Sequence, residues 1–205
     1  MRKRCLTVCF GPMFSGKTAF LAEHASRLSS IAKRKVLVCM PATDTRRSRE
    51  EIVSLGGARA PAIQIGDPFE ILGLAESVQA QEVLIDEVQF FRQMVEKEDR
   101  EDWSIVFVVK ALLQQEINVC VTGLNTDFLG YSFRPTTDLM GIADDLMRMR
   151  AVCTVCGEPA DWSLRLIDGQ PVGTGKLIVV AGTQGEEGKG RETYEARCGK
   201  HHPFA

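Results

Sequence analysis

Residues 11–18 read GPMFSGKT and fit the pattern G-x-x-x-x-G-K-[ST] without a mismatch. The two glycines permit backbone angles that turn successive amide groups inward around a phosphate. Lys17 would place its charge on the β- and γ-phosphates, and the Thr18 hydroxyl can bind Mg²⁺. We therefore expect this loop to hold the phosphates of a nucleoside triphosphate through all eight residues: Gly11, Pro12, Met13, Phe14, Ser15, Gly16, Lys17 and Thr18.

A pair of carboxylates follows the apolar run EVLI and forms the second half of this predicted site. Asp86 is expected to hold Mg²⁺, through water. Glu87, next to it, is then available as a base for an incoming nucleophile. That nucleophile is water in an ATPase and a substrate hydroxyl in a kinase. The residues alone predict a Mg·ATP enzyme and leave hydrolysis and transfer both open.

Two short pairs near the end of the chain have the spacing of metal ligands, Cys153 with Cys156 and Cys198 with His201. Three thiolates and one imidazole complete a tetrahedral zinc site, which indicates a structural metal. His202 is a competing fourth ligand, although the two-residue spacing favours His201. The other cysteines lie singly in apolar runs and are expected to be reduced core residues: Cys5, Cys9, Cys39 and Cys120.

Short apolar runs alternate with helical patterns, which favours a parallel α/β sheet covered on both faces. The expected strands are residues 5–10, 35–40, 82–87 and 117–124. The expected helices are residues 17–32 and 104–115, with another short one within 66–78. The charged segment 92–103 is expected to be a solvated loop or an exposed helix.

The composition changes near residue 151, where cysteines and then a glycine-rich tract replace the alternating elements. We expect a P-loop NTPase-like parallel sheet core over residues 1–150. A small zinc-binding domain would follow over residues 151–205.

Charge and hydropathy exclude several classes of protein. The formal net charge of −2 argues against a nucleic-acid-binding surface. No apolar run approaches the roughly 20 residues that cross a bilayer. The apolar part of MRKRCLTVCF is too short for a signal peptide, so we interpret it as a first buried strand and expect a cytoplasmic protein.

Seven motifs together make the chain similar to the zinc-containing, tetrameric (type II) thymidine kinases over about residues 4–202. In chain order they are GPMFSGKT, DTRRS, DEVQFF, GLNTDFLGYSF, CTVCGEPA, RLIDGQPV and YEARCGKHH. The resemblance implies transfer of the γ-phosphoryl of ATP to the 5′-hydroxyl of thymidine, giving dTMP and ADP. It also implies Mg²⁺ with ATP, a structural Zn²⁺, a homotetramer and feedback inhibition by dTTP.

The resemblance also implies roles for residues around the phosphates. Lys17, Glu87 and Arg46 would be catalytic, with Glu87 as the base for the 5′-hydroxyl proton and Arg46 stabilising charge on the transferred group. Asp86 matches the Mg²⁺ side. Asp44, Thr45 and Gln89 match segments that contact the nucleotide.

A thymidine pocket is implied in the same way. Its aromatic walls would be Phe90, Phe128 and Phe133, with Met13 near the base. A "lasso" between the two zinc pairs would close over thymidine with these residues: Ser163, Leu177, Ile178, Val179, Val180, Ala181, Gly182 and Tyr194.

The chain departs from the family pattern in the lasso, where Trp162 and Leu164 are unusual and the segment is lengthened. A kinase with a shifted preference, such as for deoxyuridine, is therefore one alternative. A P-loop ATPase that drives conformational work is another. A third alternative is a zinc-ribbon nucleic-acid-binding module, but the net charge of −2 argues against it.

Overall fold

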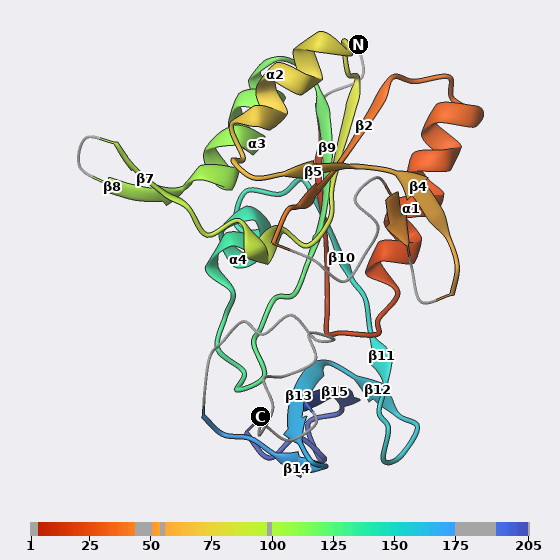
Figure 1. Ribbon diagram of the computed structural model, residues 1–205, viewed down its shortest axis with the longest axis vertical. Helices are drawn as coiled ribbons and strands as arrows, with labels where there is room; N and C mark the ends of the chain where they lie inside the picture. Colours follow the sequence, from red (N-terminus) through yellow and green to blue (C-terminus); the bar gives the residue numbers. More distant parts are fainter. Residues whose placement is uncertain (1–3, 44–50, 54–55, 98–99, 175–191, 205) are drawn as a thin grey trace.

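The computed structural model describes residues 4–43, 51–53, 56–97, 100–174 and 192–204. Its centre is a six-stranded sheet in the order β10-β1-β9-β6-β2-β5, in which all neighbouring strands are parallel (Figure 1). The strands are β1 (Leu6–Phe10), β2 (Val36–Pro41), β5 (Ile63–Ile65), β6 (Glu82–Ile85), β9 (Asn118–Gly123) and β10 (Asp145–Arg148). The expectation of a parallel α/β core is confirmed.

The four expected strands are β1, β2, β6 and β9, which occupy the middle of the sheet. The sequence did not indicate the two edge strands. β5 has only three residues, and all four residues of β10 are exposed. An edge strand needs no apolar run, because one side of it faces solvent.

Helices cover both faces of the sheet, as Figure 1 shows. The helix α1 (Lys17–Ser30) packs Leu21 and Ala22 against one face, where Leu84 also points. The helices α2 (Glu70–Ser77), α3 (Ser104–Gln114) and α4 (Arg134–Met140) lie on the other face, toward which Val83 and Ile85 point. Alternate residues of one strand thus enter different core layers, which explains the continuous apolar runs. The three expected helices are confirmed, and α4 is additional.

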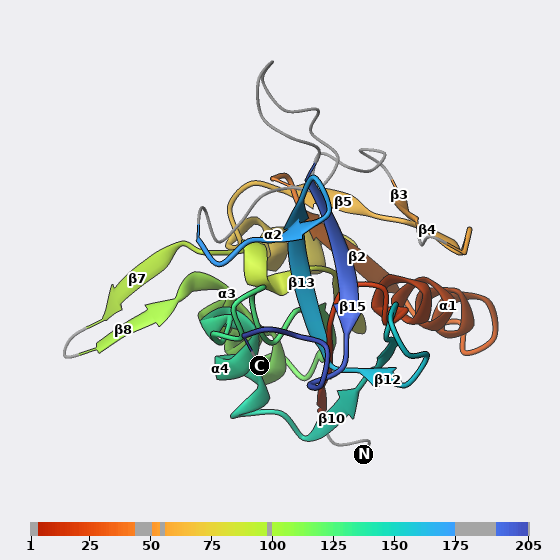
Figure 2. The same cartoon turned by 90° about the horizontal axis from the view of Figure 1, so that it is seen from below.

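The expectation of a loop or an exposed helix over residues 92–103 is wrong. They contain an antiparallel hairpin of β7 (Met94–Lys97) and β8 (Arg100–Trp103), in which Met94 opposes Trp103. The hairpin projects from the body in Figures 1 and 2. A two-stranded ribbon satisfies backbone groups while leaving charged side chains in water, so a run of charges does not exclude a strand. A second small hairpin joins β3 (Glu51–Val53) and β4 (Arg59–Pro61).

The C-terminal part contains no helix among its described residues. It consists of β11 (Ala151–Val152), β12 (Pro159–Ala160), β13 (Trp162–Ile167), β14 (Gln170–Pro171) and β15 (Glu192–Arg197). Strand β13 pairs antiparallel with both β14 and β15. The carboxyl ends of β1 and β9 point toward this lobe in Figure 1. The division into domains at residue 151 stays a prediction.

Candidate active site and metal centre

The predicted phosphate loop leaves the carboxyl end of β1 and enters α1, whose first residue is Lys17. Both glycines are required by the backbone. Gly16 is left-handed, with φ 84° and ψ 11°. At Gly11 an added Cβ atom would lie 2.0 Å from the Met149 carbonyl oxygen. The N-terminus of α1 therefore opens into a loop whose amides and helix dipole both favour an anion.

Lys17 lies inside this loop and is almost completely buried. Its Nζ atom donates hydrogen bonds to the carbonyl oxygens of Gly11 (3.1 Å) and Pro12 (2.6 Å) and to Ser15 Oγ (3.2 Å). Ser15 Oγ in turn donates to the Pro12 carbonyl oxygen at 2.8 Å. The ammonium group is thus held within the concavity in which the sequence expects phosphates.

Asp86 joins the loop to the centre of the sheet and is 1% exposed. The Thr18 hydroxyl donates to Asp86 Oδ2 at 3.0 Å, and the Thr122 hydroxyl donates to Asp86 Oδ1. The two residues predicted to bind Mg²⁺ are therefore neighbours. A hydroxyl and a carboxylate oxygen beside a phosphate loop are the hard oxygen ligands that Mg²⁺ prefers, so the donor set fits this ion. Sequence reasoning missed Thr122, whose signal is a lone hydroxyl at the end of an apolar strand.

Glu87 follows Asp86 in a left-handed conformation, with φ 53° and ψ 45°. It precedes the short 3₁₀ helix η1 (Val88–Phe90) and is half-buried. Its Oε2 atom accepts a hydrogen bond from Gln89 Nε2. The backbone of a residue other than glycine is strained in this region by about 1 kcal/mol or more, and such strain concentrates at functional sites.

The predicted aromatic residues lie on the loop that follows β9 and on η1. Phe128 and Phe133 are buried, and Phe90 is half-buried. The loop around Phe128 is fixed by Asp127, whose Oδ1 atom accepts the amides of Leu129 (2.8 Å) and Tyr131 (3.0 Å).

Arg165 lies beside this wall, with its guanidinium carbon 5.3 Å from the centroid of the Phe128 ring. It is buried and forms a two-bond ion pair with Glu192, at 2.9 and 3.1 Å. The sequence did not indicate this pair, since the partners are 27 residues apart. Tyr194 lies opposite Arg165 in the pairing of β13 with β15.

Ser163 connects the C-terminal lobe to the phosphate loop. Its Oγ atom accepts a hydrogen bond from the Met13 amide at 2.9 Å, and the side chain is buried. Two residues predicted to contact the substrate are thus in direct contact with each other. On the neighbouring segment, Gly130 approaches Trp162 so closely that an added Cβ atom would lie 3.1 Å from its ring.

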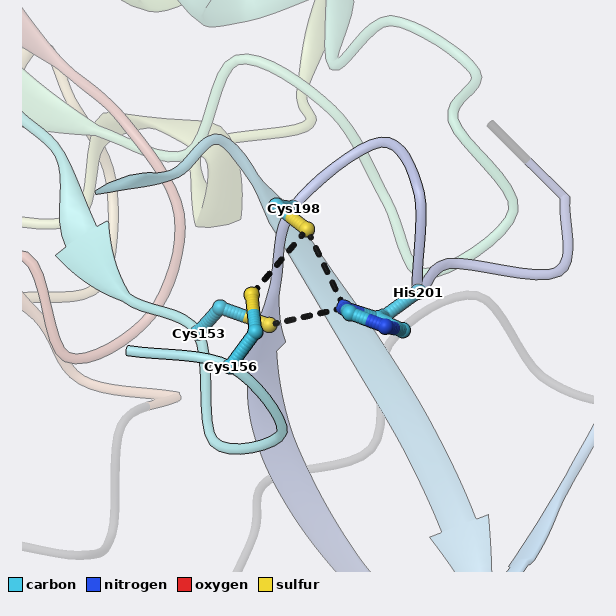
Figure 3. A group of neighbouring side chains, drawn as sticks. All are labelled: Cys153, Cys156, Cys198 and His201. Atoms are coloured by element: carbon cyan, nitrogen blue, oxygen red, sulfur yellow. Dashed lines mark hydrogen bonds between the residues drawn. The ribbon is translucent and has the colours of Figure 1, made fainter. Parts of the chain in front are cut away.

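The four predicted zinc ligands lie together, as Figure 3 shows. Their ligand atoms are all within 4.8 Å of one another. The Sγ atoms of Cys156 and Cys198 are 3.8 Å apart, and His201 Nδ1 lies 3.3 Å from Cys198 Sγ and 3.7 Å from Cys153 Sγ. A tetrahedral site with Zn–S bonds of about 2.3 Å has S···S edges of about 3.8 Å and S···N edges of about 3.6 Å, so the cluster fits zinc.

Hydrogen bonds favour the ionised form of the Cys153 thiol. Burial opposes its ionisation, but backbone hydrogen bonds of Cys198, Val155 and Cys156 and the ring of His201 outweigh burial and lower the pKa of the thiol to about 5. A thiolate is the form that binds zinc.

His202, the competing ligand, points elsewhere. Its Nε2 atom lies 3.3 Å from the Ser163 carbonyl oxygen, and its Nδ1 atom accepts the Phe204 amide at 3.3 Å. Burial lowers the pKa of His202, which keeps the ring neutral at pH 7. The neutral ring therefore connects the segment after the metal cluster to Ser163.

Some predicted site residues lie outside the described residues. These are Asp44, Thr45 and Arg46 of the DTRRS motif, and the lasso residues Leu177, Ile178, Val179, Val180, Ala181 and Gly182. In the described part of the chain, no helix is both long and apolar enough to cross a membrane.

A strand, a phosphate loop, a helix and a strand-end carboxylate define a P-loop nucleotide-binding α/β protein with an added Cys₃His centre. A KaiC-like protein from Pyrococcus horikoshii shares this fold, with a TM-score of 0.50 and 14% identity over 76% of this chain and 75% of that chain. A family model described as thymidine kinase matches residues 4–202. The chain therefore belongs to the thymidine kinase family, whose members are phosphotransferases that act on thymidine.

Individual relatives support this assignment over nearly the whole chain. A thymidine kinase of Thermococcus kodakarensis is 38% identical, covering 96% of this chain and 93% of the relative. That of Mycoplasmoides gallisepticum is 41% identical, covering 94% and 78%. That of Coprothermobacter proteolyticus is 39% identical, covering 96% and 89%. The Cys₃His cluster is consistent with the zinc-containing type II branch that the sequence motifs indicated.

Proposed function

We propose that this chain transfers the γ-phosphoryl group of Mg·ATP to the 5′-hydroxyl of thymidine, with Glu87 as the general base. Glu87 would take the hydroxyl proton as the oxygen attacks phosphorus, giving dTMP and ADP. Lys17 and the backbone amides of residues 14–18 would hold the phosphates, and Arg46 would stabilise the charge that develops during transfer. Gly11, Ser15, Asp44 and Thr45 would complete the nucleotide site.

One observation carries this proposal. The Thr18 hydroxyl and Asp86 Oδ2 are 3.0 Å apart, and Glu87 is the next residue along the chain. A phosphate-loop hydroxyl, a metal-side carboxylate and a second carboxylate are therefore in one place at the carboxyl edge of the sheet. In such a site the second carboxylate can accept a proton while the first serves the cation.

Mg²⁺ is the ion that Thr18 and Asp86 suit. When bound with ATP, it would neutralise phosphate charge and favour departure of ADP. Thr122 and Thr18 orient the Asp86 carboxylate for this role through their hydrogen bonds.

We propose a structural role for zinc, held by Cys153, Cys156, Cys198 and His201. All four positions of the tetrahedron would be filled by protein, which leaves none for substrate. The ion would tie the turn after β11 to the turn after β15 (Figure 3). The lobe that the ion closes carries Ser163. Thymidine would be surrounded by the lasso together with Phe90, Phe128, Phe133, Met13 and Tyr194.

The variant Glu87→Gln tests the proposed base. It should bind ATP almost normally and lower thymidine-dependent turnover about 10²-fold or more, the usual contribution of a general base. Glu76→Gln is the matched control, because Glu76 is exposed on α2 away from the site. Unchanged turnover in Glu87→Gln, with the control also unchanged, would remove Glu87 from the mechanism.

We also propose a cytoplasmic homotetramer that dTTP inhibits. The support is the type II resemblance of the motifs, together with the family assignment. Light scattering of the purified protein would give the molecular mass, and a mass near that of the 22.7 kDa monomer would contradict the assembly. Competition of dTTP with thymidine tests the inhibition.

A further inference from the structure

We propose that Gln89 is a positioning residue for Glu87, holding the carboxylate in the direction that proton removal requires. This inference rests on the proposed role of Glu87 as the base. It differs from the expectation, taken from the resemblance, that Gln89 contacts the nucleotide. The evidence is the hydrogen bonding and the burial of the Gln89 amide.

Both ends of the Gln89 amide are engaged. Its Nε2 group donates to Glu87 Oε2, and its Oε1 atom accepts the Leu124 amide at 3.0 Å. The backbone amide of Leu124 can only donate, so Oε1 must face it and the NH₂ group must face Glu87. The reverse orientation would set donor against donor and acceptor against acceptor. The Leu124 amide, directly after β9, therefore determines that the NH₂ group of Gln89 faces the Glu87 carboxylate.

The slot that holds this side chain is closed. Gln89 is fully buried, so its amide has no accessible surface to offer a nucleotide. The last residue of β9, Gly123, forms one wall. An added Cβ atom there would lie 2.7 Å from Thr136 Oγ1, 2.8 Å from Val88 Cγ2 and 3.0 Å from Gln89 Oε1. Glycine at position 123 leaves the room that Gln89 occupies.

Glu87 needs such a support because it follows Asp86 in a strained backbone position and is half-buried. A glutamate side chain has three rotatable bonds, and a base must lie within hydrogen-bond reach of the proton it removes. Holding Oε2 restricts rotation of the side chain and therefore the positions that Oε1 can take. A displacement of about 1 Å in such a group can lower a rate about 10²-fold.

The variant Gln89→Met tests this role, since methionine is similar in length and cannot donate. We expect kcat to fall about 10- to 100-fold while the KM values for ATP and thymidine stay within about twofold. Gln93→Met is the matched control. Gln93 is exposed, and its side chain donates a hydrogen bond to the Gly66 carbonyl oxygen, away from Glu87. The control should keep wild-type kinetics.

A double-mutant cycle separates positioning from a general structural effect. If Gln89 acts through Glu87, then Glu87→Gln combined with Gln89→Met should turn over no more slowly than Glu87→Gln alone. A further loss in the double variant equal to that in Gln89→Met would overturn the proposal. So would an unchanged kcat with a raised KM for ATP, which would make Gln89 a nucleotide contact.

A second variant covers the case in which Gln89→Met does not fold. Gln89→Glu keeps the shape and the acceptor for the Leu124 amide, and sets an ionisable carboxyl oxygen, which repels the Glu87 carboxylate when it is charged, in place of the amide donor. It should also lower kcat at least tenfold with ATP binding retained, and wild-type turnover would contradict the proposal. Failure of the base itself is distinguishable, because Glu87→Gln alone would then keep wild-type turnover.

Discussion

The variant Gly11→Ala should damage the phosphate loop in a way that the structure makes quantitative. The added Cβ atom would lie 2.0 Å from the Met149 carbonyl oxygen. Because ordinary contacts begin near 3.4 Å, loop and carbonyl must separate by about 1.4 Å. Neither side is flexible. Gly11 begins the loop that holds Lys17, and Met149 donates its amide to the Phe10 carbonyl oxygen at 2.8 Å.

Overpacking of this kind costs about 1–3 kcal/mol of folding free energy. For a domain of this size, the unfolding midpoint should fall by about 2–12 °C, at 2–4 °C per kcal/mol. Phosphate binding should suffer more, because a 1 Å misplacement in a binding site can cost about 10²-fold. We therefore expect kcat/KM for ATP to fall about 10²-fold.

The matched control is Gly73→Ala, since no atom lies within 4 Å of the position that its Cβ atom would take. Gly73 is in the middle of α2, where alanine should raise stability by about 0.5–1 kcal/mol without changing the kinetics. Thermal unfolding and steady-state kinetics with varied ATP measure both variants. If Gly11→Ala kept the wild-type midpoint and kcat/KM, the described packing of the loop against Met149 would be refuted.

Two further predictions concern the C-terminal lobe. Ser163→Ala removes the acceptor of the Met13 amide, and the loss of about 1 kcal/mol should appear as a rise of about fivefold in the KM for ATP, whereas Ser29→Ala on the far end of α1 should leave it unchanged. An unchanged KM in Ser163→Ala would mean that the lobe does not hold the loop. The zinc content should fall once the pH drops below about 5, because protons then compete with the metal for the Cys153 thiolate. The pKa of the unliganded thiol is lowered to about 5 in the folded protein, so the stability that its ionisation contributes is fully present above the unfolded value of about 9 and is lost below the folded one. Metal analysis after dialysis at pH 7 and at pH 4 measures the release, and full retention at pH 4 would contradict it.

The chemistry-bearing residues were predictable because their spacing is local. The phosphate loop, the Asp86–Glu87 pair and the zinc pairs each fall within a short window, and glycine, lysine, carboxylate and thiolate have few other uses in those patterns. The central strands were predictable for a related reason. A strand buried on both faces must be a continuous apolar run, as in β6 and β9.

The residues that support the site were harder to predict. Thr122 and Arg165 act through partners that lie 36 and 27 residues away. Gln89 was expected to contact the nucleotide, and its orientation toward Glu87 is set by the Leu124 amide, 35 residues along the chain. Their types are common, and only the fold shows that each is buried against a charged group. The hairpin of β7 and β8 was missed because its charges carry no helical or alternating apolar period. The edge strand β10 was missed for a different reason. All four of its residues are exposed, so it needs no apolar run.

Phosphoryl transfer to thymidine is tested by measuring the formation of ADP from Mg·ATP with and without thymidine, at equal enzyme concentration. ADP should appear only with thymidine, in step with dTMP, and Glu87→Gln should lower both products together. Equal formation of ADP without thymidine would contradict this transfer, because the γ-phosphoryl group would then be going to water.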